Sequence, residues 1–440
     1  MMKTKSLLLC CAVSCLSATG FAQTLADSFE KLPEPDLQSK MWKTSTGPVV
    51  KSSPQEMVSK IKSLKRGQTL LVAPGELNQV VNVTVSGTAD APITLKAEKK
   101  HQTQVKGFKL SGDYIIIDGF EITNPTPKSV GIDTGEVHRE TARTGCQMHN
   151  NYIHDIVETA INTGVDGLAT GNLIRNVGRG FMVNSGSLVE GNEVDTLLPQ
   201  TMTKKGKETL KKTQYAFFAG DKIVFRGNYF HGTAKEHLKA GMGVCFFTTW
   251  DYWIIGSSSQ ILIENNIGFN ATHASEPEQG KLMKSSNFTY RNNLFGDTVF
   301  VGVFPKKIPY LTIENNTFIN CGAYPVWFAT PLQATGSVVR NNLIAYVNRG
   351  PDVQAYGWKA AESGIRIDAK ASEMEVGNNL YHGCLNRKYA ASDFEAEPMF
   401  VNASKKDFRL KPGSPGVDKN VGISNEIVIA PLVSETSSTH

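Results

Sequence analysis

The 440-residue sequence predicts an all-β fold, in which the chain winds into a single parallel β-helix of roughly 10–12 coils. Two observations predict this fold. An asparagine recurs with similar neighbours, in most copies directly after a short apolar strand such as Ile261-Leu262-Ile263-Glu264. The apolar strands are only about 4–6 residues long, and no amphipathic helices separate them, which excludes alternating β-α-β units.

The recurring asparagines are spaced like the coils of a solenoid. The copies are Asn151, Asn172, Asn192, Asn228, Asn266, Asn293, Asn316, Asn342 and Asn379. They are 21, 20, 36, 38, 27, 23, 26 and 37 residues apart, and a unit of roughly 20–27 residues with occasional extra loops is typical of stacked coils. Asparagine tolerates the left-handed backbone of a sharp corner, and its amide can hydrogen-bond to the copies above and below. We therefore interpret these residues as a structural ladder and not as catalytic groups.

The chain divides into four segments. Residues 1–22 have the pattern of a secretory signal, with Lys3 and Lys5 before an apolar stretch that is too short to span a bilayer. Residues 23–52 are expected to form an extended lead-in, residues 53–385 the β-helix, and residues 386–440 a capping tail with a disordered end. At the start of the β-helix segment, Ser53-Pro54-Gln55-Glu56 is a capping box with proline at the first helical position. It predicts a short helix that covers the open end of the solenoid.

Composition and charge exclude some classes of function. The signal segment carries two lysines and no acidic residue, so its removal lowers the formal net charge from +5 to +3. This mild basicity suits an anionic polysaccharide, and nothing resembles a nucleic-acid-binding module. We expect a monomer without a membrane span, secreted or periplasmic, although Ala12-Val13-Ser14-Cys15 leaves lipoprotein anchoring as an alternative. The basic run at residues 204–212 lies in an insertion and fits a solvated loop.

The cysteines predict neither a disulfide nor a zinc site. Four remain after signal removal, namely Cys146, Cys245, Cys321 and Cys384. Cys321 and Cys384 should lie two coils apart, which is roughly 9.6 Å and too far for a disulfide. No CxxC or HExxH spacing is present, so we expect no structural zinc site.

Two stretches carry a resemblance to a known class of protein. They are the repeat Asn150-Asn151-Tyr152-Ile153-His154-Asp155 and the ending from Glu397-Pro398-Met399-Phe400-Val401 to Gly416-Val417-Asp418. Both resemble secreted right-handed parallel β-helix proteins of bacteria, many of which act on carbohydrates. The resemblance implies a right-handed helix with a groove for an extended polymer. Insertions at about residues 125–145, 198–214, 232–258 and 347–363 would line it, because loops on a rigid scaffold commonly carry function.

The stretch His273-Ala274-Ser275-Glu276-Pro277-Glu278-Gln279-Gly280-Lys281-Leu282-Met283-Lys284 resembles a segment of the chondroitinase B and alginate lyase family. The resemblance implies that Glu276 and Glu278 bind Ca²⁺ and that Lys284 is the catalytic base, with Lys281 as its neighbouring candidate. The lysine comes one residue later than in the family. The family's arginine one coil later has no counterpart near residues 301–304, although Lys306 and Lys307 follow, and its asparagine ligand is not identifiable.

Other polar and aromatic clusters are candidates for the groove. Arg366 alternates with apolar residues on a late strand and, with His273, completes the catalytic candidates. The aromatic cluster around Trp250 suits stacking on sugar faces, and the charged loop around His138 suits a sulfate or carboxylate. The substrate-binding candidates are Trp250, Asp251, Trp253, His138, Arg139, His237, Lys306 and Asp368. Each of these residues also fits a solvated surface or a self-packed loop.

The leading hypothesis is a secreted polysaccharide lyase that cleaves a uronate-containing polysaccharide by β-elimination. Such an enzyme needs a base, and a cation or metal that offsets the charge developing on the substrate. A glycoside hydrolase needs instead two carboxyl groups at a defined separation, which a sequence does not give. A non-catalytic glycan-binding surface protein is the third interpretation.

Overall fold

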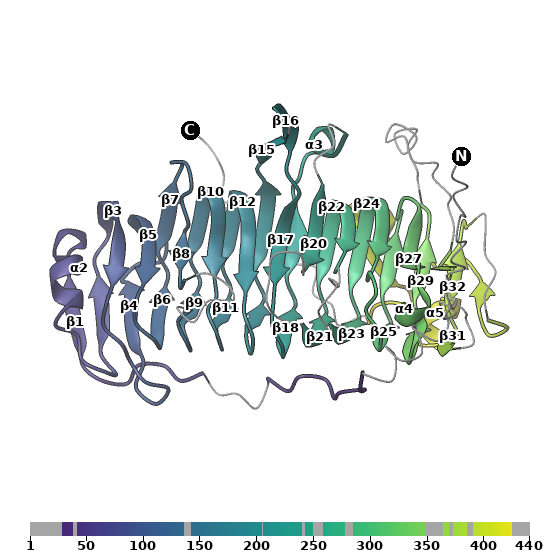
Figure 1. Ribbon diagram of the computed structural model, residues 1–440, viewed down its shortest axis with the longest axis horizontal. Helices are drawn as coiled ribbons and strands as arrows, with labels where there is room; N and C mark the ends of the chain where they lie inside the picture. The colour runs from purple at the N-terminus through teal and green to yellow at the C-terminus, as the bar shows by residue number, and fades with distance from the viewer. Residues whose placement is uncertain are drawn as a thin grey trace, which may run out of the picture.

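The computed structural model describes residues 29–37, 42–135, 142–204, 206–239, 243–249, 258–277, 285–347, 364–368, 373–384 and 390–424. These residues form an elongated parallel β-helix whose coils follow one another along the long axis (Figure 1). The predicted fold class is therefore confirmed. Among the described residues, no helix is long and apolar enough to cross a membrane. The signal segment, residues 1–22, lies outside the described residues.

One sheet runs the whole length of the molecule and contributes one strand to each coil. In spatial order its 13 described strands are β1 (Val49–Ser52), β2 (Thr69–Val72), β4 (Ile93–Ala97), β6 (Ile115–Asp118), β9 (Gln147–His149), β11 (Leu168–Thr170), β13 (Leu188–Glu190), β18 (Ile223–Arg226), β21 (Ser259–Glu264), β23 (Ser286–Arg291), β25 (Leu311–Glu314), β28 (Ser337–Arg340) and β31 (Met374–Gly377). The count exceeds the predicted range because β1 lies in the segment expected to be an extended lead-in.

The other faces are formed by the strands that follow the asparagine corner. They are β3 (Gly75–Val83), β5 (Thr103–Leu110), β7 (Glu121–Asn124), β8 (Ile132–Asp133), β10 (Tyr152–Asn162), β12 (Leu173–Val183), β14 (Glu193–Leu197), β17 (Thr213–Phe218), β19 (Tyr229–His231), β20 (Val244–Thr248), β22 (Ile267–Ser275), β24 (Leu294–Val303), β26 (Thr317–Ile319), β27 (Tyr324–Phe328), β29 (Leu343–Ala345), β30 (Arg366–Ile367), β32 (Leu380–His382) and β33 (Phe394–Glu395). Long strands such as β22 pair with β19 at one end and β20 at the other, so they turn from one face to the next.

The predicted asparagine ladder is present, and two adjacent positions in each coil have different structural roles. Asn266 is fully buried, and its amide donates to Asn293 Oδ1 at 3.0 Å while its own Oδ1 accepts from Asn228 Nδ2 at 2.9 Å. The preceding residue takes the left-handed backbone, with φ of 58° at Asn265. In other coils a glycine takes that place, as at Gly227 with φ of 61°. Burial therefore fixes the second residue of each pair. Backbone conformation fixes the first, whose side chain can also hydrogen-bond between coils, as Asn292 Nδ2 does to Asn265 Oδ1.

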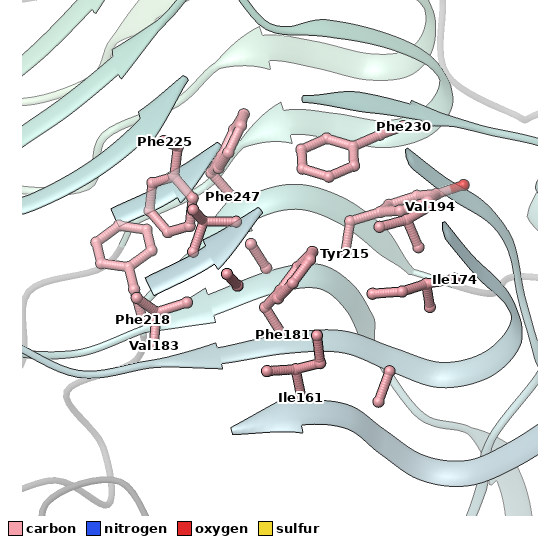
Figure 2. Packing of buried hydrophobic residues seen from close by; sticks show 14 of the residues in the cluster. Ile161, Ile174, Phe181, Val183, Val194, Tyr215, Phe218, Phe225, Phe230 and Phe247 are labelled. Atoms are coloured by element: carbon pink, nitrogen blue, oxygen red, sulfur yellow. The ribbon is translucent and has the colours of Figure 1, made fainter. Parts of the chain in front are cut away.

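The interior is filled by aliphatic and aromatic columns (Figure 2). In the middle coils, Phe225 and Phe247 lie with ring centroids 5.0 Å apart, and Phe230 and Phe247 lie 5.3 Å apart. Stacked rings of this kind contribute beyond the area that they bury. These aromatic contacts lie in the coils that carry the two insertions described below.

The ends and one flank are covered by short elements. Helix α2 (Pro54–Ile61) has the predicted capping box at Ser53 and Glu56 and buries Met57 and Ile61 over the first coil. The lead-in follows the 13-stranded sheet, where Leu32 donates to Asn287 Oδ1 at 2.8 Å. At the other end of the chain the elements are α4 (Pro331–Ala334), β34 (Phe400–Asn402), η3 (Ala403–Lys405), β35 (Asp407–Leu410) and α5 (Pro415–Asp418).

Opposite charges alternate in register along the outside of the 13-stranded sheet. Arg226 Nε lies 2.7 Å from Glu264 Oε1, and Arg291 Nη2 lies 2.9 Å from Glu264 Oε2. The row continues on the next coils through Glu314 and Arg340, which are 3.0 Å apart. Opposite charges on adjacent strands stabilise the pairing of the coils.

Two insertions project from the same side of the molecule (Figure 1). They are the hairpin β15 (Thr201–Lys204) and β16 (Lys207–Leu210), and the short helix α3 (Lys235–Lys239). Both lie in the stretches that unusually long asparagine spacings predict as insertions. The four cysteines of the described chain, at positions 146, 245, 321 and 384, are free thiols.

Candidate functional site

A register-matched row of side chains lies on one outer face of the β-helix. Gln214 on β17 is opposite Cys245 on β20, which is opposite His273 on β22. On β24 and β27 the row continues with Val301 and Tyr324. The residues that follow them in sequence at 215, 246 and 274 belong to the core, so the row points away from the interior of the solenoid. The side chains at 214, 245, 273 and 301 are nevertheless buried.

Glu276 follows β22 and is the centre of the site. Its backbone N–H donates to the carbonyl of Phe247, and its own carbonyl accepts from Thr248 Oγ1 at 2.8 Å. These bonds to the previous coil hold a side chain that is only 5% exposed. Lys306 Nζ lies 2.7 Å from Oε1, and Lys212 Nζ lies 3.1 Å from Oε2. One carboxylate is thus placed between ammonium groups from two other coils.

Charge and burial act against each other at Glu276. Burial raises the pKa of this carboxyl, but His273, Lys212 and Lys306 outweigh that effect and lower the pKa to about 2. Burial also lowers the pKa of His273 to about 4, which leaves the imidazole neutral at pH 7. The site at neutral pH therefore holds one anion and two cations, an excess of positive charge.

A thiol and an imidazole lie against the same carboxylate. Cys245 Sγ is 3.8 Å from Glu276 Oε2 and 3.9 Å from His273 Nδ1. His273 Nδ1 is 3.7 Å from Glu276 Oε2, and its Nε2 is buried without a hydrogen-bond partner. Burial raises the pKa of the Cys245 thiol well above its ordinary value. The thiol is therefore protonated and unreactive unless something displaces its proton.

An aromatic platform lies beside this cluster. Phe304 and Trp327 are stacked with centroids 4.5 Å apart and an interplanar angle of 6°. Lys306 Nζ lies 5.3 Å from the Phe304 ring centroid, which joins the platform to the Glu276 cluster. Arg366 Cζ lies 4.8 Å from the centroid of the Trp327 ring on the next coil.

Arg366 and Asp368 are held at the edge of that platform. Arg366 Nε donates to Asp368 Oδ1 at 2.9 Å, and Trp327 Nε1 donates to Asp368 Oδ2 at 2.8 Å. Burial raises the pKa of Asp368, but these two donors and the Arg366 charge reverse the effect and lower it. The hydrogen bond to Asp368 raises the pKa of Arg366. Both side chains are partly exposed and present charge beside a flat ring.

The structure brings together several of the residues singled out from the sequence. His273, Glu276 and Lys306 share one cluster, and Arg366 and Asp368 connect to it through Trp327 and Phe304. His237 lies on α3, and no hydrogen bond or ion pair within the described residues joins it to this cluster. The remaining candidates lie outside the described residues: Lys281, Lys284, Glu278, Trp250, Asp251, Trp253, His138 and Arg139. Their assigned roles stay predictions.

Sequence reasoning missed two members of the cluster. Lys212 is the last residue of a basic run that fitted a solvated loop, yet it reaches Glu276. Cys245 matches no local zinc motif, and its register with His273 on β20 and β22 is not visible in the sequence. One signal was available in the sequence. Lys212 directly precedes an apolar strand, so its side chain is expected to lie next to the solenoid and not in the outer part of the loop.

The described donors around Glu276 do not fit calcium. Ca²⁺ takes six to eight oxygen ligands, with carboxylates, carbonyls and water as its usual donors. Here the carboxylate oxygens face two ammonium groups, a thiol and an imidazole nitrogen. The predicted second carboxylate, Glu278, lies outside the described residues. No step through calcium is derived from this geometry.

Comparison with known proteins agrees with the architecture. The family described as "Right handed beta helix region" matches residues 251–392. The chain has the right-handed parallel β-helix fold. This β-helix is similar to the structure of the PL6 family alginate lyase AlyGC, with 15% identity and a TM-score of 0.52, over 87% of this chain and 57% of that one. The chain thus spans little more than half the length of that lyase.

A second solved structure is similar to the same extent. The A-module of the Azotobacter vinelandii mannuronan C-5 epimerase AlgE6 has 12% identity and a TM-score of 0.54, over 78% of this chain and 92% of that module. Identities this low establish the shared fold alone. A comparison with curated protein sequences found no match.

Proposed function

We propose that this protein is an exported polysaccharide lyase that cleaves a uronate-containing polysaccharide by β-elimination. One observation carries the proposal: Lys212 and Lys306 converge on buried Glu276 on an outer face of the β-helix, next to the Phe304 and Trp327 platform. Net positive charge beside flat aromatic rings is what an acidic sugar chain requires, because its carboxylates need cations and its C–H faces need flat apolar surfaces.

The chemistry assigns a task to the two lysines. A base removes the proton from the carbon next to the uronate carboxyl group, and the electron pair forms a C=C bond as the glycosidic oxygen leaves and takes up a proton. The developing negative charge is delocalised onto the carboxyl group. The ammonium groups of Lys306 and Lys212 are positioned to stabilise that charge, since Glu276 holds both in place before substrate arrives.

The base of this reaction is proposed on the sequence resemblance alone. Lys284 is the first candidate and Lys281 the second. His273 is buried and neutral at pH 7, so its role in the proposal is to position Glu276 and not to contact the sugar. Calcium bound by Glu276 and Glu278 is implied by the sequence resemblance alone and disagrees with the ammonium, thiol and imidazole groups around Glu276, so unchanged activity is expected with a calcium-selective chelator.

The sugar-binding surface is proposed to extend from the lysines across Trp327 to Arg366 and Asp368. The indole face suits a sugar ring, and Arg366 suits a second carboxylate along the chain. His237 on α3 would extend the surface. Five residues outside the described part of the molecule would complete it, namely Trp250, Asp251, Trp253, His138 and Arg139. An exported or periplasmic location follows from the signal at residues 1–22 and from the nature of the substrate.

One assay separates the possible functions. The purified protein is incubated with a panel of uronate polysaccharides, and ultraviolet absorbance from new C=C bonds is followed together with reducing ends. Absorbance supports a lyase, whereas reducing ends without absorbance indicate a glycoside hydrolase. Exchange of the proton next to the carboxyl group in D₂O without cleavage indicates an epimerase. Binding without any of these changes indicates a non-catalytic glycan-binding protein.

A further inference from the structure

We infer that Cys245, His273 and Glu276 form a binding site for a divalent transition-metal ion of the Zn²⁺ type. The site shares Glu276 with the lysine pair of the function proposed above, but it is inferred from its donor atoms and not from that function. Three different donor atoms meet there, a sulfur, an imidazole nitrogen and a carboxylate oxygen, and all three side chains are buried. The local motifs of zinc sites are missing from the sequence because two neighbouring coils supply these donors.

The distances among the donor atoms match those of ligands around one ion. Sγ to Nδ1 is 3.9 Å, Sγ to Oε2 is 3.8 Å and Nδ1 to Oε2 is 3.7 Å. The triangle is nearly equilateral, so its centre lies about 2.2 Å from each atom (the side divided by √3), between the usual Zn–N distance of about 2.0 Å and the Zn–S distance of about 2.3 Å. A tetrahedral ion lies slightly outside this plane, so the three donors would move a little closer together on binding.

Hydrogen bonding does not explain the same geometry. A nitrogen-to-oxygen hydrogen bond spans about 2.7–3.2 Å, which is shorter than the 3.7 Å between His273 Nδ1 and Glu276 Oε2. His273 Nε2 is also buried without a hydrogen-bond partner, and the hydrogen-bond contact of Nδ1 is the long one to Cys245 Sγ at 3.9 Å. A buried imidazole with so few contacts loses its hydration with little compensation, and a metal ion bound at Nδ1 would strengthen the interaction at that nitrogen.

The backbone holds the three donors in place. Cys245 and His273 are directly opposite each other on β20 and β22, in the middle of paired strands. Glu276 follows three residues after His273 and is fixed by its backbone hydrogen bonds to the β20 coil. A site built on paired strands is more rigid than one built on loops, which favours tight binding.

A bound metal ion and the two lysines, Lys212 and Lys306, would all contact the carboxylate of Glu276. The ion would use Oε2, the oxygen that Lys212 contacts at 3.1 Å. The Lys212 side chain is 47% exposed and can withdraw into solvent. Lys306 contacts the other oxygen, Oε1, and can remain as an outer partner of the bound carboxylate. Metal binding and the Lys212 contact therefore exclude each other, whereas the Lys306 contact does not.

The donor set selects the class of ion. A thiolate and an imidazole favour Zn²⁺ or Co²⁺ over Ca²⁺ and Mg²⁺, which prefer oxygen ligands. Cys245 must lose its proton to become a thiolate, so one proton is released to the buffer for each ion bound. Three protein ligands leave a fourth position for water or another small ligand.

The test uses the full chain, stripped of metal and titrated with Co²⁺, because a cobalt–thiolate bond gives an intense near-ultraviolet charge-transfer band. We expect the band to saturate at one equivalent, to disappear on addition of Zn²⁺ and to persist in excess Ca²⁺. It should be absent from Cys245→Ser and unchanged in Cys321→Ser, which alters another buried free thiol. A wild-type protein without the band, or a band that survives Cys245→Ser, overturns the inference.

The competition with Lys212 gives a second readout. Lys212→Met should tighten Co²⁺ binding about tenfold or more, because the ion no longer competes with an ammonium group for Oε2. Lys211→Met removes the neighbouring positive charge and serves as the matched control, with little change expected. Equal affinities in the two variants would overturn the shared-oxygen geometry. All readouts are of metal binding, so they stand apart from any result of the lyase assay.

Discussion

Lys306 Nζ lies 2.7 Å from Glu276 Oε1, and the two residues follow strands β24 and β22 of adjacent coils. The lysine is 28% exposed while the carboxylate is 5% exposed, so the pair has one buried and one accessible member. This asymmetry suits a ligand site, because the ammonium group can bind a substrate carboxylate without leaving its partner. It also makes the pair the most informative place to test the proposed function.

Replacing Lys306 should separate function from packing. We expect Lys306→Met to lower kcat/KM on a uronate substrate about 10²-fold, because a preorganised cation is removed from the developing charge. Stability should fall by about 1–3 kcal/mol, since Glu276 loses one of two charge partners. Lys307→Met is the control, and the measurements are initial rates by C=C absorbance and urea unfolding. Equal rates for the two variants would remove Lys306 from the site.

Acid should weaken the charge row on the 13-stranded sheet through Glu264. Burial raises the pKa of Glu264, but Arg291 and Arg226 outweigh it and the pKa is lowered from 4.5. A carboxyl with a lowered pKa in the folded state contributes stability that is complete above its unfolded pKa and is lost as pH falls below it. Stability should therefore decline below pH 4.5, and the decline should be smaller in Glu264→Gln.

The measurement is urea unfolding at several pH values between 7 and 3. At pH 7, Glu264→Gln should be less stable than wild type by about 1–3 kcal/mol, because two arginines lose their shared partner. The difference should shrink as the pH approaches 3. Glu375→Gln is the control, since that side chain is 62% exposed and ends the same row. Parallel pH curves for wild type and Glu264→Gln would contradict the assignment.

Substitution of two adjacent asparagines should lower stability to very different extents. Asn266→Ala removes the hydrogen bonds to Asn293 and Asn228 in a fully buried position, so we expect a loss of about 3 kcal/mol or more. Asn265→Gly should cost only about 1 kcal/mol, because glycine adopts the required φ of 58° without strain and the change removes a single partly buried hydrogen bond from Asn292. Thermal unfolding of the two variants checks this, and equal losses would show that the two positions do not divide the work as described.

The ladder was predictable because its signal is local. Each buried asparagine has the same neighbours in sequence, so the repeat is visible without knowing how the coils pair. The different roles of Asn265 and Asn266 leave a weaker sequence signal. Both roles favour asparagine, and only the coils with Gly171, Gly191 or Gly227 at the first position distinguish them. The periodicity of the sequence predicts the coils, whereas the contacts between coils determine the structural role of each residue.

The candidate site was only partly predictable because its members come from different coils. Glu276 and His273 stood out within one short stretch, but Lys212 precedes Glu276 by 64 residues. Cys245 meets His273 only because 28 residues, including an insertion, make one coil between them. Loop lengths set that register, and no local rule of spacing reports it. For the same reason, that its neighbours come from other coils, Cys245 belongs to no local zinc motif in the sequence.

Trp327 should bind substrate without taking part in the chemistry. Its ring is stacked on Phe304 and contacts Arg366. Its strand, β27, pairs with β24, the strand that precedes Lys306. We expect Trp327→Ala to raise KM about tenfold on a long polysaccharide with kcat changed less than about threefold, since uniform binding is lost and transition-state contacts remain. Trp327→Phe should recover most of the loss, because a flat ring is restored. Trp42→Phe is the control, as Trp42 packs with Leu37 and Leu168 against the 13-stranded sheet. A fall in kcat with unchanged KM would instead place Trp327 among the residues that act on the reacting sugar.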